Sequence, residues 1–411
     1  MSNTLKVIDM VAKEALRIAH EKATFIATVD RSYDDSYAKT GAKIGNTLRV
    51  RNPNQYVRRQ GSRVMDVQDQ DESTQTITMA TQDGVDMRFN SAELTLDTDN
   101  PNAVDLFSKR YIEPAVSQLV SGIDGDCIVQ ATKDTYNVVG TPGTVVGASS
   151  DITALGNARS RLNQGLAPKD MNRAIQLDSI TMASIVNGNK ALFLPDNQIK
   201  KAFTEGFYSR SAMADFYENE RTYRHTVGSD VTVNTSSSAA VTDGGTNITM
   251  NSTDGNINAG DVFTVAGVYA CHPETKQSLG YLQQFVATAA STGAVTVSPP
   301  TYLTGAKKNV VSATSGTLAT TDFNSKAMVF VGTASTAYQQ NLMYHKEAYT
   351  FVTADLPIMD DAHKCVRKTM DGLSMRVWMA SDIRNDELLM RIDILYGFKT
   401  LRPAWACRIT N

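Results

Sequence analysis

Residues 226–340 are poor in charge and rich in Thr, Ser, Gly, Ala and Val. Ten of these 115 residues are charged, which is under half the charge density of the whole chain, where 20% are charged. Short runs in this segment alternate between apolar and polar residues, a pattern that predicts strands. Several short strands at this spacing indicate a small barrel or sandwich. The charged residues are Asp230, Asp243, Asp254, Asp261, Glu274, Lys276, Lys307, Lys308, Asp322 and Lys326.

Six strands are predicted in this segment, separated by turn signals such as Asp243-Gly244-Gly245, Asp254-Gly255 and Ser291-Thr292-Gly293. The sequence before the segment reads as helical and the sequence after it as mixed. We therefore expect a compact β-module, with bounds 228–340, set inside another domain. The predicted strands are 231–233, 247–250, 262–265, 283–287, 294–297 and 327–331.

The composition sets broad limits on the class of protein. A chain of 411 residues with 42% apolar side chains can bury a large core, and its length predicts two or three domains. A net charge of −3 gives no general attraction to nucleic acid or anionic lipid. The four cysteines lie far apart with no C-x-x-C pair, which indicates reduced and mostly buried thiols. They are Cys127, Cys271, Cys365 and Cys407.

No segment predicts export or membrane insertion. Residues 1–25 carry seven charged side chains and lack the apolar centre of a signal peptide. No window approaches the roughly eighteen uncharged apolar residues that a spanning helix needs. We expect a protein that is soluble and intracellular when it is made.

Residues 46–78 predict a long hairpin with ordered charges. Runs 47–51 and 75–79 alternate with a period of two, and basic residues precede acidic ones between them. A hairpin so poor in apolar residues needs support from another surface. One interpretation is a solvated hairpin whose strands neutralise each other, and the other is an arm that meets adjacent copies of the chain. The residues of this candidate inter-subunit contact are Arg49, Arg51, Arg58, Arg59, Arg63, Asp66, Asp69, Asp71 and Glu72.

The remaining periodic segments predict a mixture of helices and strands. Apolar side chains recur at helical spacing over 103–130, which predicts a long helix with Pro114 as a destabilising interior residue. Further helices are expected at 5–27, 151–165, 179–188 and 198–207. Further strands are expected at 85–90, 94–96, 171–178, 373–378, 388–396 and 405–409.

No catalytic, cofactor-binding or metal-binding constellation is recognisable. The five histidines show neither H-x-x-x-H nor H-E-x-x-H spacing, and no nucleophile elbow, phosphate loop or dinucleotide fingerprint occurs. Arg58-Arg59 beside Tyr56 resembles a nucleic-acid patch, but acidic residues follow closely, so we favour a subunit contact. We expect a protein without catalytic activity, cofactor or metal.

The order of these elements resembles that of the major capsid proteins of tailed bacteriophages. It is similar to the short-tailed Salmonella phage coat-protein family, whose Hong Kong 97-type fold carries an inserted β-barrel domain. Two segments carry the specific likeness. One is residues 258–268, Asn-Ala-Gly-Asp-Val-Phe-Thr-Val-Ala-Gly-Val. The other is 391–397, Arg-Ile-Asp-Ile-Leu-Tyr-Gly, followed by Arg402-Pro403.

The resemblance implies an α+β fold with named parts. It implies an N-arm at 1–32, an extended E-loop at 46–78, and a P-domain with a spine helix at 33–45 and 79–135. It also implies an A-domain at 136–227 and 341–399, the inserted barrel at 228–340, and a C-terminal P-domain strand at 400–411. The E-loop contains no lysine, so nothing predicts a Lys–Asn crosslink.

The resemblance also implies a function and partners. The chain would be a major capsid protein that assembles into hexamers and pentamers of an icosahedral head around double-stranded DNA. Its partners would be copies of itself, a scaffolding protein, a portal protein and non-specifically bound DNA, with assembly in the host cytoplasm and residence in the virion.

Two other functional classes remain open on the sequence. The β-module could be an adhesin or carbohydrate binder, which requires exposed aromatics on its strands. The candidates are Phe263, Tyr269, Tyr281, Phe285 and Tyr302. A hydrolase that uses scattered carboxylates has only ordinary composition in its favour.

Overall fold

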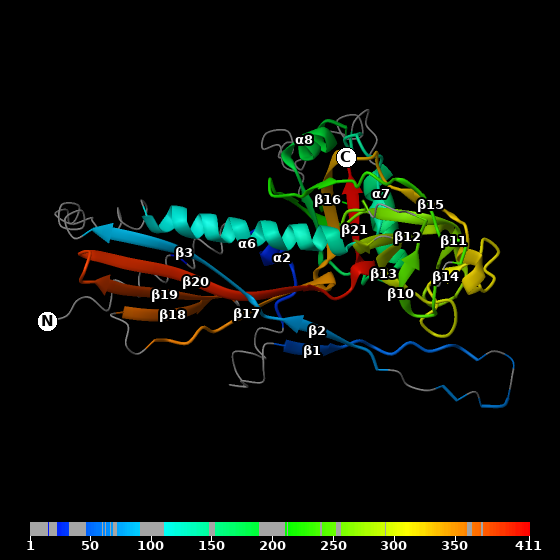
Figure 1. The fold of residues 1–411 in the computed structure, drawn as a ribbon, viewed down its shortest axis with the longest axis horizontal. Coiled ribbons are helices and arrows are strands. Elements are labelled where there is room, and N and C mark those ends of the chain that lie inside the picture. The colour runs from blue at the N-terminus through cyan, green and yellow to red at the C-terminus, as the bar shows by residue number, and fades with distance from the viewer. Residues whose placement is uncertain are drawn as a thin grey trace. The chain divides into compact units, whose positions relative to one another are not determined.

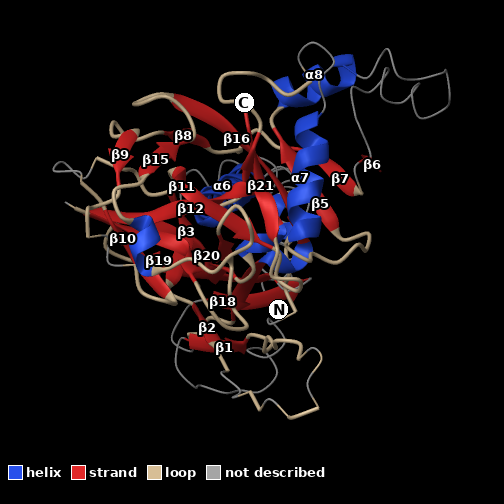
Figure 2. Cartoon of the chain, turned by 90° about the vertical axis from the view of Figure 1, so that its right-hand side faces the viewer, coloured by secondary structure: helices blue, strands red, loops and turns tan. Residues whose placement is uncertain are grey.

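The computed structural model describes most of the chain as two compact units. One unit comprises Met1–Val50, Gln75–Cys127 and Tyr349–Lys399, and the other comprises Arg51–Thr74, Ile128–Ala348 and Thr400–Asn411. Each unit is mixed α and β, and strands dominate both (Figure 2). The described residues are 15, 23–32, 47–59, 61, 63–65, 67–68, 72–90, 111–147, 153–188, 210–211, 213–238, 241–251, 256–291, 293–359, 364–370 and 373–411.

The first unit is built on a five-stranded sheet with the order β17-β20-β19-β18, to which β3 is added beside β20 (Figure 1). One face is apolar, because alternate residues such as Met375, Val377 and Ile392 are buried. On the other face Arg376 pairs with Asp393 directly across two strands at 2.6 Å. The strands are β3 (Thr81–Asn90), β17 (Tyr349–Ala354), β18 (Lys364–Met370), β19 (Leu373–Asp382) and β20 (Glu387–Thr400).

The structure describes the long helix α6 over Glu113–Asp134, directly after residues 111–112, which form a wider helical turn. The first part of the predicted helix at 103–130 lies outside the described residues. The expectation that Pro114 is a destabilising interior residue therefore stays a prediction. Gly122 and Gly125 lie inside the helix with open space around them. The buried stripe of Val116, Leu119, Val120 and Ile123 repeats at helical spacing.

A buried carboxylate on α6 fixes the chain near its start. Asp124 accepts hydrogen bonds from the backbone N–H groups of Phe25 and Ile26, both at 3.0 Å, and from the Thr24 hydroxyl at 3.1 Å. These residues open the short helix α2 (Phe25–Thr28), whose first N–H groups have no partner within the helix. The acidic side chain at this position satisfies them and suits the helix dipole.

Replacing Asp124 with Asn is expected to lower the free energy of unfolding by about 1–2 kcal/mol, because the charge-assisted bonds become neutral ones. The measurement is chemical denaturation. Asp126→Asn is the matched control, since Asp126 is exposed on the same helix. Equal stability of the two variants would contradict the anchoring role of Asp124.

The second unit contains a sheet with the order β4-β21-β16-β5-β7-β6, with β8 also paired to β16. Helix α7 (Thr153–Gln164) packs on β21 and β16 (Figure 2). Its buried side chains Leu155, Ala158 and Leu162 join Ile175, Met343 and other residues in one core. The other bounds are α8 (Ser179–Gly188), β4 (Val138–Val139), β5 (Arg173–Leu177), β6 (Arg210–Ser211), β7 (Ala214–Glu218), β8 (Arg224–Thr226), β16 (Ala337–His345) and β21 (Ala406–Thr410).

The strands near the C-terminus are grouped differently from our expectation. We expected 341–399 to share a domain with 136–227, and 400–411 to belong with 79–135. Instead β20 pairs with β3 along ten residues, from Glu387↔Asn90 to Tyr396↔Thr81. Strand β21 pairs with β16 and runs parallel to β4. Strand pairing depends on cross-strand partners far away in sequence, which the alternation within a strand does not specify.

The predicted β-module is present as a separate antiparallel sheet with the order β10-β13-β12-β11-β15-β9. All six predicted strands are confirmed, and a short β14 (Val310–Val311) adds beside β11. Backbone bonds also join the edge strands: Ser236 N–H donates to the Thr249 carbonyl at 3.0 Å, and Asn251 N–H to the Asn234 carbonyl at 2.9 Å. The bounds are β9 (Thr232–Asn234), β10 (Gly245–Thr249), β11 (Val262–Cys271), β12 (Ser278–Ser291), β13 (Ala294–Thr301) and β15 (Ala327–Phe330).

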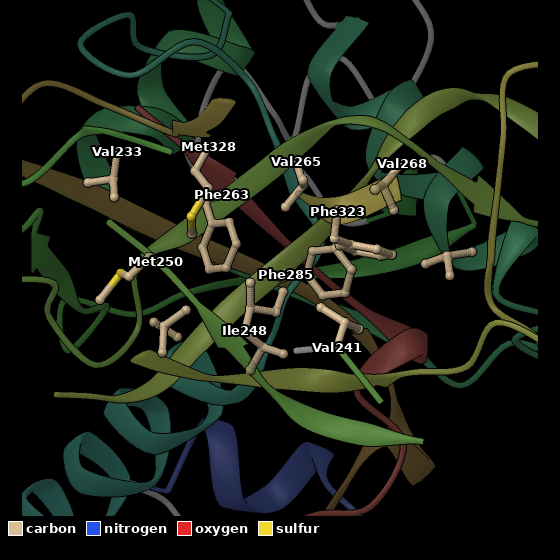
Figure 3. Close-up of a cluster of buried hydrophobic side chains, with 14 of the residues drawn as sticks. Val233, Val241, Ile248, Met250, Phe263, Val265, Val268, Phe285, Phe323 and Met328 are labelled. Atoms are coloured by element: carbon tan, nitrogen blue, oxygen red, sulfur yellow. The ribbon is translucent and has the colours of Figure 1, made fainter. Parts of the chain in front are cut away.

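The module has its own hydrophobic core. Phe263 and Phe285 are fully buried cross-strand partners on β11 and β12, and their rings lie side by side with centroids 6.0 Å apart (Figure 3). Phe330 lies 5.1 Å from Phe263, and Phe323 closes the cluster from the short 3-10 helix before β15. Buried apolar residues alternate with more exposed ones along strands such as β13 and β15, which explains why the periodicity was readable in the sequence.

The expectation of unpaired cysteines is confirmed. All four are free, and Cys127, Cys271 and Cys407 are buried. Burial raises the pKa of the Cys127 and Cys271 thiols and raises that of Cys407 to about 12. The expected helices at 5–27 and 198–207 and the strand at 94–96 lie wholly or largely outside the described residues.

Candidate assembly arm and the anchorage of the β-module

The predicted hairpin at 46–78 is present. Strands β1 (Thr47–Arg51) and β2 (Thr74–Thr78) form a two-stranded sheet. Beyond it, Asn52 N–H donates to the Ser73 carbonyl at 2.9 Å. Further out, the Gln68 side chain bonds both the N–H and the carbonyl of Val57, at 2.8 and 2.6 Å. The described residues of the arm are therefore joined by a few polar bonds and form no hydrophobic core of their own.

The predicted contact residues are exposed wherever they are described. Arg49, Arg51, Arg58, Arg59, Arg63 and Glu72 all have exposed side chains. Arg51 faces Glu72 at 3.6 Å, a weak pair between two well-exposed side chains. The Arg59 guanidinium donates to the Val64 carbonyl. Asp66, Asp69 and Asp71 lie outside the described residues.

Sequence reasoning missed the apolar side chains of the arm. Tyr56, Val64, Met65 and Val67 are all at least 60% exposed, and Val57 is 45% exposed. Five apolar side chains of the arm's described residues are therefore exposed in the single subunit. The signal was present as Val64-Met65 and Val67 among charged neighbours, but the charge pattern dominated our interpretation.

A buried carboxylate anchors the β-module to the unit that carries it. Asp261, 2% exposed, accepts a hydrogen bond from His225 Nε2 at 2.7 Å. It also accepts the backbone N–H groups of Gly228 at 3.0 Å and Asn258 at 2.8 Å. His225 belongs to β8, and Asn258 and Asp261 immediately precede β11. The Asp261 side chain thus joins the segment that leads into the module, at His225 and Gly228, to the start of β11 inside the module.

A second buried bond ties the module to the C-terminal strand. Arg408 of β21 donates to the Gly260 carbonyl at 2.7 Å and to the Lys133 carbonyl at 3.2 Å. Gly260 has φ +104°, and a Cβ there would lie 3.0 Å from Lys133 Cγ and 3.1 Å from His225 Cε1. Only glycine fits this backbone conformation and this space without strain. Asp261, His225, Asn258, Gly260 and Arg408 are called the anchor below.

Two further contacts hold the module beside α7 and β4. Val138 N–H donates to Gln284 Oε1, and Gln284 Nε2 donates to the Val138 carbonyl, both at 2.9 Å. The Arg161 guanidinium lies 3.3 Å from the centre of the Tyr281 ring, and the Tyr281 hydroxyl donates to Gln164 at 2.9 Å. Burial raises the pKa of that hydroxyl, and the nearby Arg161 charge offsets this in part.

Other features of the described residues bear on chemistry. No group of three or more His, Cys, Asp or Glu side chains there is arranged to hold a metal ion. No helix in the described part of the chain has the length and hydropathy to cross a membrane. Cys271 ends β11, and His272 opens the turn after it, where His272 Nδ1 accepts the backbone N–H groups of Glu274 and Thr275.

Solved structures of phage particles resemble the chain only at low similarity. A structure from Mycobacterium phage Che8 is 10% identical with a TM-score of 0.48, covering 94% of this chain and 90% of that chain. The capsid of cyanophage P-SCSP1u is 13% identical with a TM-score of 0.44, covering 89% of this chain and 83% of that chain. The mature capsid of bacteriophage PhiM1 is 9% identical with a TM-score of 0.44, covering 89% of this chain and 82% of that chain. These identities and TM-scores are too low to assign a function to the chain.

A family model gives the assignment. The model described as "P22 coat protein - gene protein 5" matches residues 2–407. None of the curated proteins matches the chain significantly. Because the family match spans nearly all of the 411 residues, the chain belongs to the P22 coat protein family.

Proposed function

We propose that this phage coat protein assembles into hexamers and pentamers of an icosahedral head that encloses double-stranded DNA. The observation that carries the proposal, beside the family match, is the arm at 46–78, whose apolar and basic side chains face water. Many identical copies that meet through unlike surfaces can close a shell without any catalytic chemistry. The arm is the E-loop in this proposal, and each arm lies on an adjacent copy.

The other parts follow the same proposal. Residues 1–32 are the N-arm, α6 is the P-domain spine helix, and the sheet around β16 belongs to the A-domain. The β-module at 228–340 is an inserted barrel, which the backbone bonds between β9 and β10 support. A scaffolding protein and a portal protein are partners, assembly takes place in the host cytoplasm, and DNA contact is non-specific.

The adhesin alternative is not favoured. It required exposed aromatic side chains on the module strands, but Phe263 and Phe285 are fully buried. Tyr269, Tyr281 and Tyr302 are half-buried, and Tyr281 is covered by Arg161. No described aromatic of the candidate set is presented as a flat exposed platform for a sugar ring.

Replacing Arg58 and Arg59 together with Ala is expected to leave the subunit folded and to weaken assembly. Exposed substitutions of this kind usually change the free energy of unfolding by about 0.5 kcal/mol or less. The measurements are thermal unfolding of the subunit and the yield of particles by sedimentation. Lys307→Ala with Lys308→Ala removes the same charge outside the arm and is the matched control. Normal particle yield and stability from the arginine variant would rule out a contact through these two residues.

A further inference from the structure

The C-terminal end of the long helix α6 is held by the last segment of the chain. The Thr400 hydroxyl donates to the Asp134 carboxylate at 2.8 Å, and the Arg408 guanidinium donates to the Lys133 carbonyl at 3.2 Å. Lys133 and Asp134 are the last two residues of α6. A carbonyl in the last turn has no partner within the helix, and a cation beside it suits the helix dipole. Thr400 and Arg408 therefore fix the end of α6.

The same guanidinium also holds the entry of the β-module. Arg408 is 2% exposed, and its Nη1 donates to the Gly260 carbonyl at 2.7 Å while its Nη2 donates to the Lys133 carbonyl. The Arg408 backbone is fixed in β21, where its N–H donates to the Asn137 carbonyl at 2.8 Å. Because a guanidinium is planar and rigid, Arg408 cannot follow a movement of one carbonyl and keep its bond to the other.

Close packing joins the end of α6 to the module entry at the same place. A Cβ on Gly260 would lie 3.0 Å from Lys133 Cγ and 3.1 Å from His225 Cε1, so the Gly260 backbone lies directly against both side chains. The Lys133 ammonium in turn lies 5.5 Å from the centre of the Tyr223 ring. In a close-packed interior, Gly260 cannot shift far without displacing the last turn of α6.

We propose that Arg408 couples the end of α6 to the entry of the β-module, so that a change at one of them is transmitted to the other. Two carbonyls from distant parts of the chain share one buried guanidinium, and a movement that breaks either bond leaves a buried donor without its acceptor. Residues 113–127 of α6 belong to the first unit and residues 128–134 to the second. The module thus responds to a displacement of α6. This coupling is a property of the single subunit and does not depend on assembly.

Hydrogen exchange of the full-length, unassembled subunit tests the coupling. Thr400→Val removes the bond to Asp134 at the α6 end, and Asn258→Ala removes the bond from the Asn258 amide to the Thr226 carbonyl at the module entry. Both are mild changes that leave the core intact. Mass spectrometry follows exchange in peptides that cover 128–137 and 258–263. We expect each variant to accelerate exchange about fivefold at its own site and about two- to threefold at the other site.

Arg408→Lys shows whether the guanidinium carries the effect. Lysine keeps the charge but has a single ammonium in place of the fork, so each of the two variants is expected to act only at its own site in this background. Arg402→Lys is the matched control, because Arg402 pairs with Glu347 and stacks on Trp405, and it is expected to preserve the effect at the distant site. Effects that stay local in the parent would overturn the proposal, whether or not Arg408→Lys folds. Distant effects that persist in a folded Arg408→Lys subunit would overturn it as well.

Discussion

Replacing Asp261 with Ala is expected to lower the free energy of unfolding by about 3–5 kcal/mol. The change leaves His225 and the N–H groups of Gly228 and Asn258 without their acceptor in a buried place. Water cannot easily replace the carboxylate, because both the Asp261 and His225 side chains are about 95% buried or more. Chemical denaturation of the purified subunit measures the loss.

Glu274→Ala is the matched control for this prediction. Glu274 is an exposed acidic residue of the same module, so its removal is expected to change stability by about 0.5 kcal/mol or less. If Asp261→Ala unfolded with the same midpoint as this control, the anchor would not hold the module. Full stability without Asp261 would mean that the contacts of Gln284 and Tyr281 suffice.

Replacing Phe263 alone with Ala is expected to lower the free energy of unfolding by about 3–5 kcal/mol. Phe263 is fully buried in the module core between Phe285 and Phe330, and its loss leaves a cavity that the surrounding side chains fill only in part. Calorimetry measures the shift in unfolding. A low yield of soluble subunit is expected as well. The module core consists of module residues only, so the other cores of the chain do not compensate for its loss.

Val329→Ala is the control on the neighbouring strand. Val329 is 59% exposed on β15, where it alternates with the buried Met328 and Phe330. Its truncation is expected to leave stability within about 0.5 kcal/mol of the parent. Similar losses from both variants would contradict the inside–outside alternation on which the description of the module rests.

The strands of the β-module were predictable because their side chains have one buried and one exposed face. Val295 and Val297 are buried while Ala294 and Thr296 are less so, and this period of two is visible in the letters alone. The paired runs at 47–51 and 75–79 were predictable for the same reason. Local periodicity is a short-range property, so a single sequence carries it.

The grouping of the last strands was not predictable in the same way. Strand β20 pairs with β3, which lies about three hundred residues earlier in the chain, and packing sets the register of the pair. Periodicity within either strand does not say which partner it takes.

Three residues of the anchor lie in the segment 258–268, but the sequence alone did not reveal their role. Residues 258–268 carried the family resemblance as an apolar strand, but Asn258, Gly260 and Asp261 act before that strand begins. Their partners His225 and Arg408 come from two distant parts of the chain. The apolar residues of the arm were visible in the sequence as Val64-Met65 and Val67, but their exposure depends on the folded neighbourhood, which the sequence does not show.

Electron microscopy of the purified or co-expressed protein tests most directly whether it is a self-assembling shell subunit. The expected result is closed particles, or capsomers of six and five subunits, with the arm at 46–78 lying on an adjacent copy. Dispersed single subunits at every concentration, from protein shown to be folded, would contradict the account.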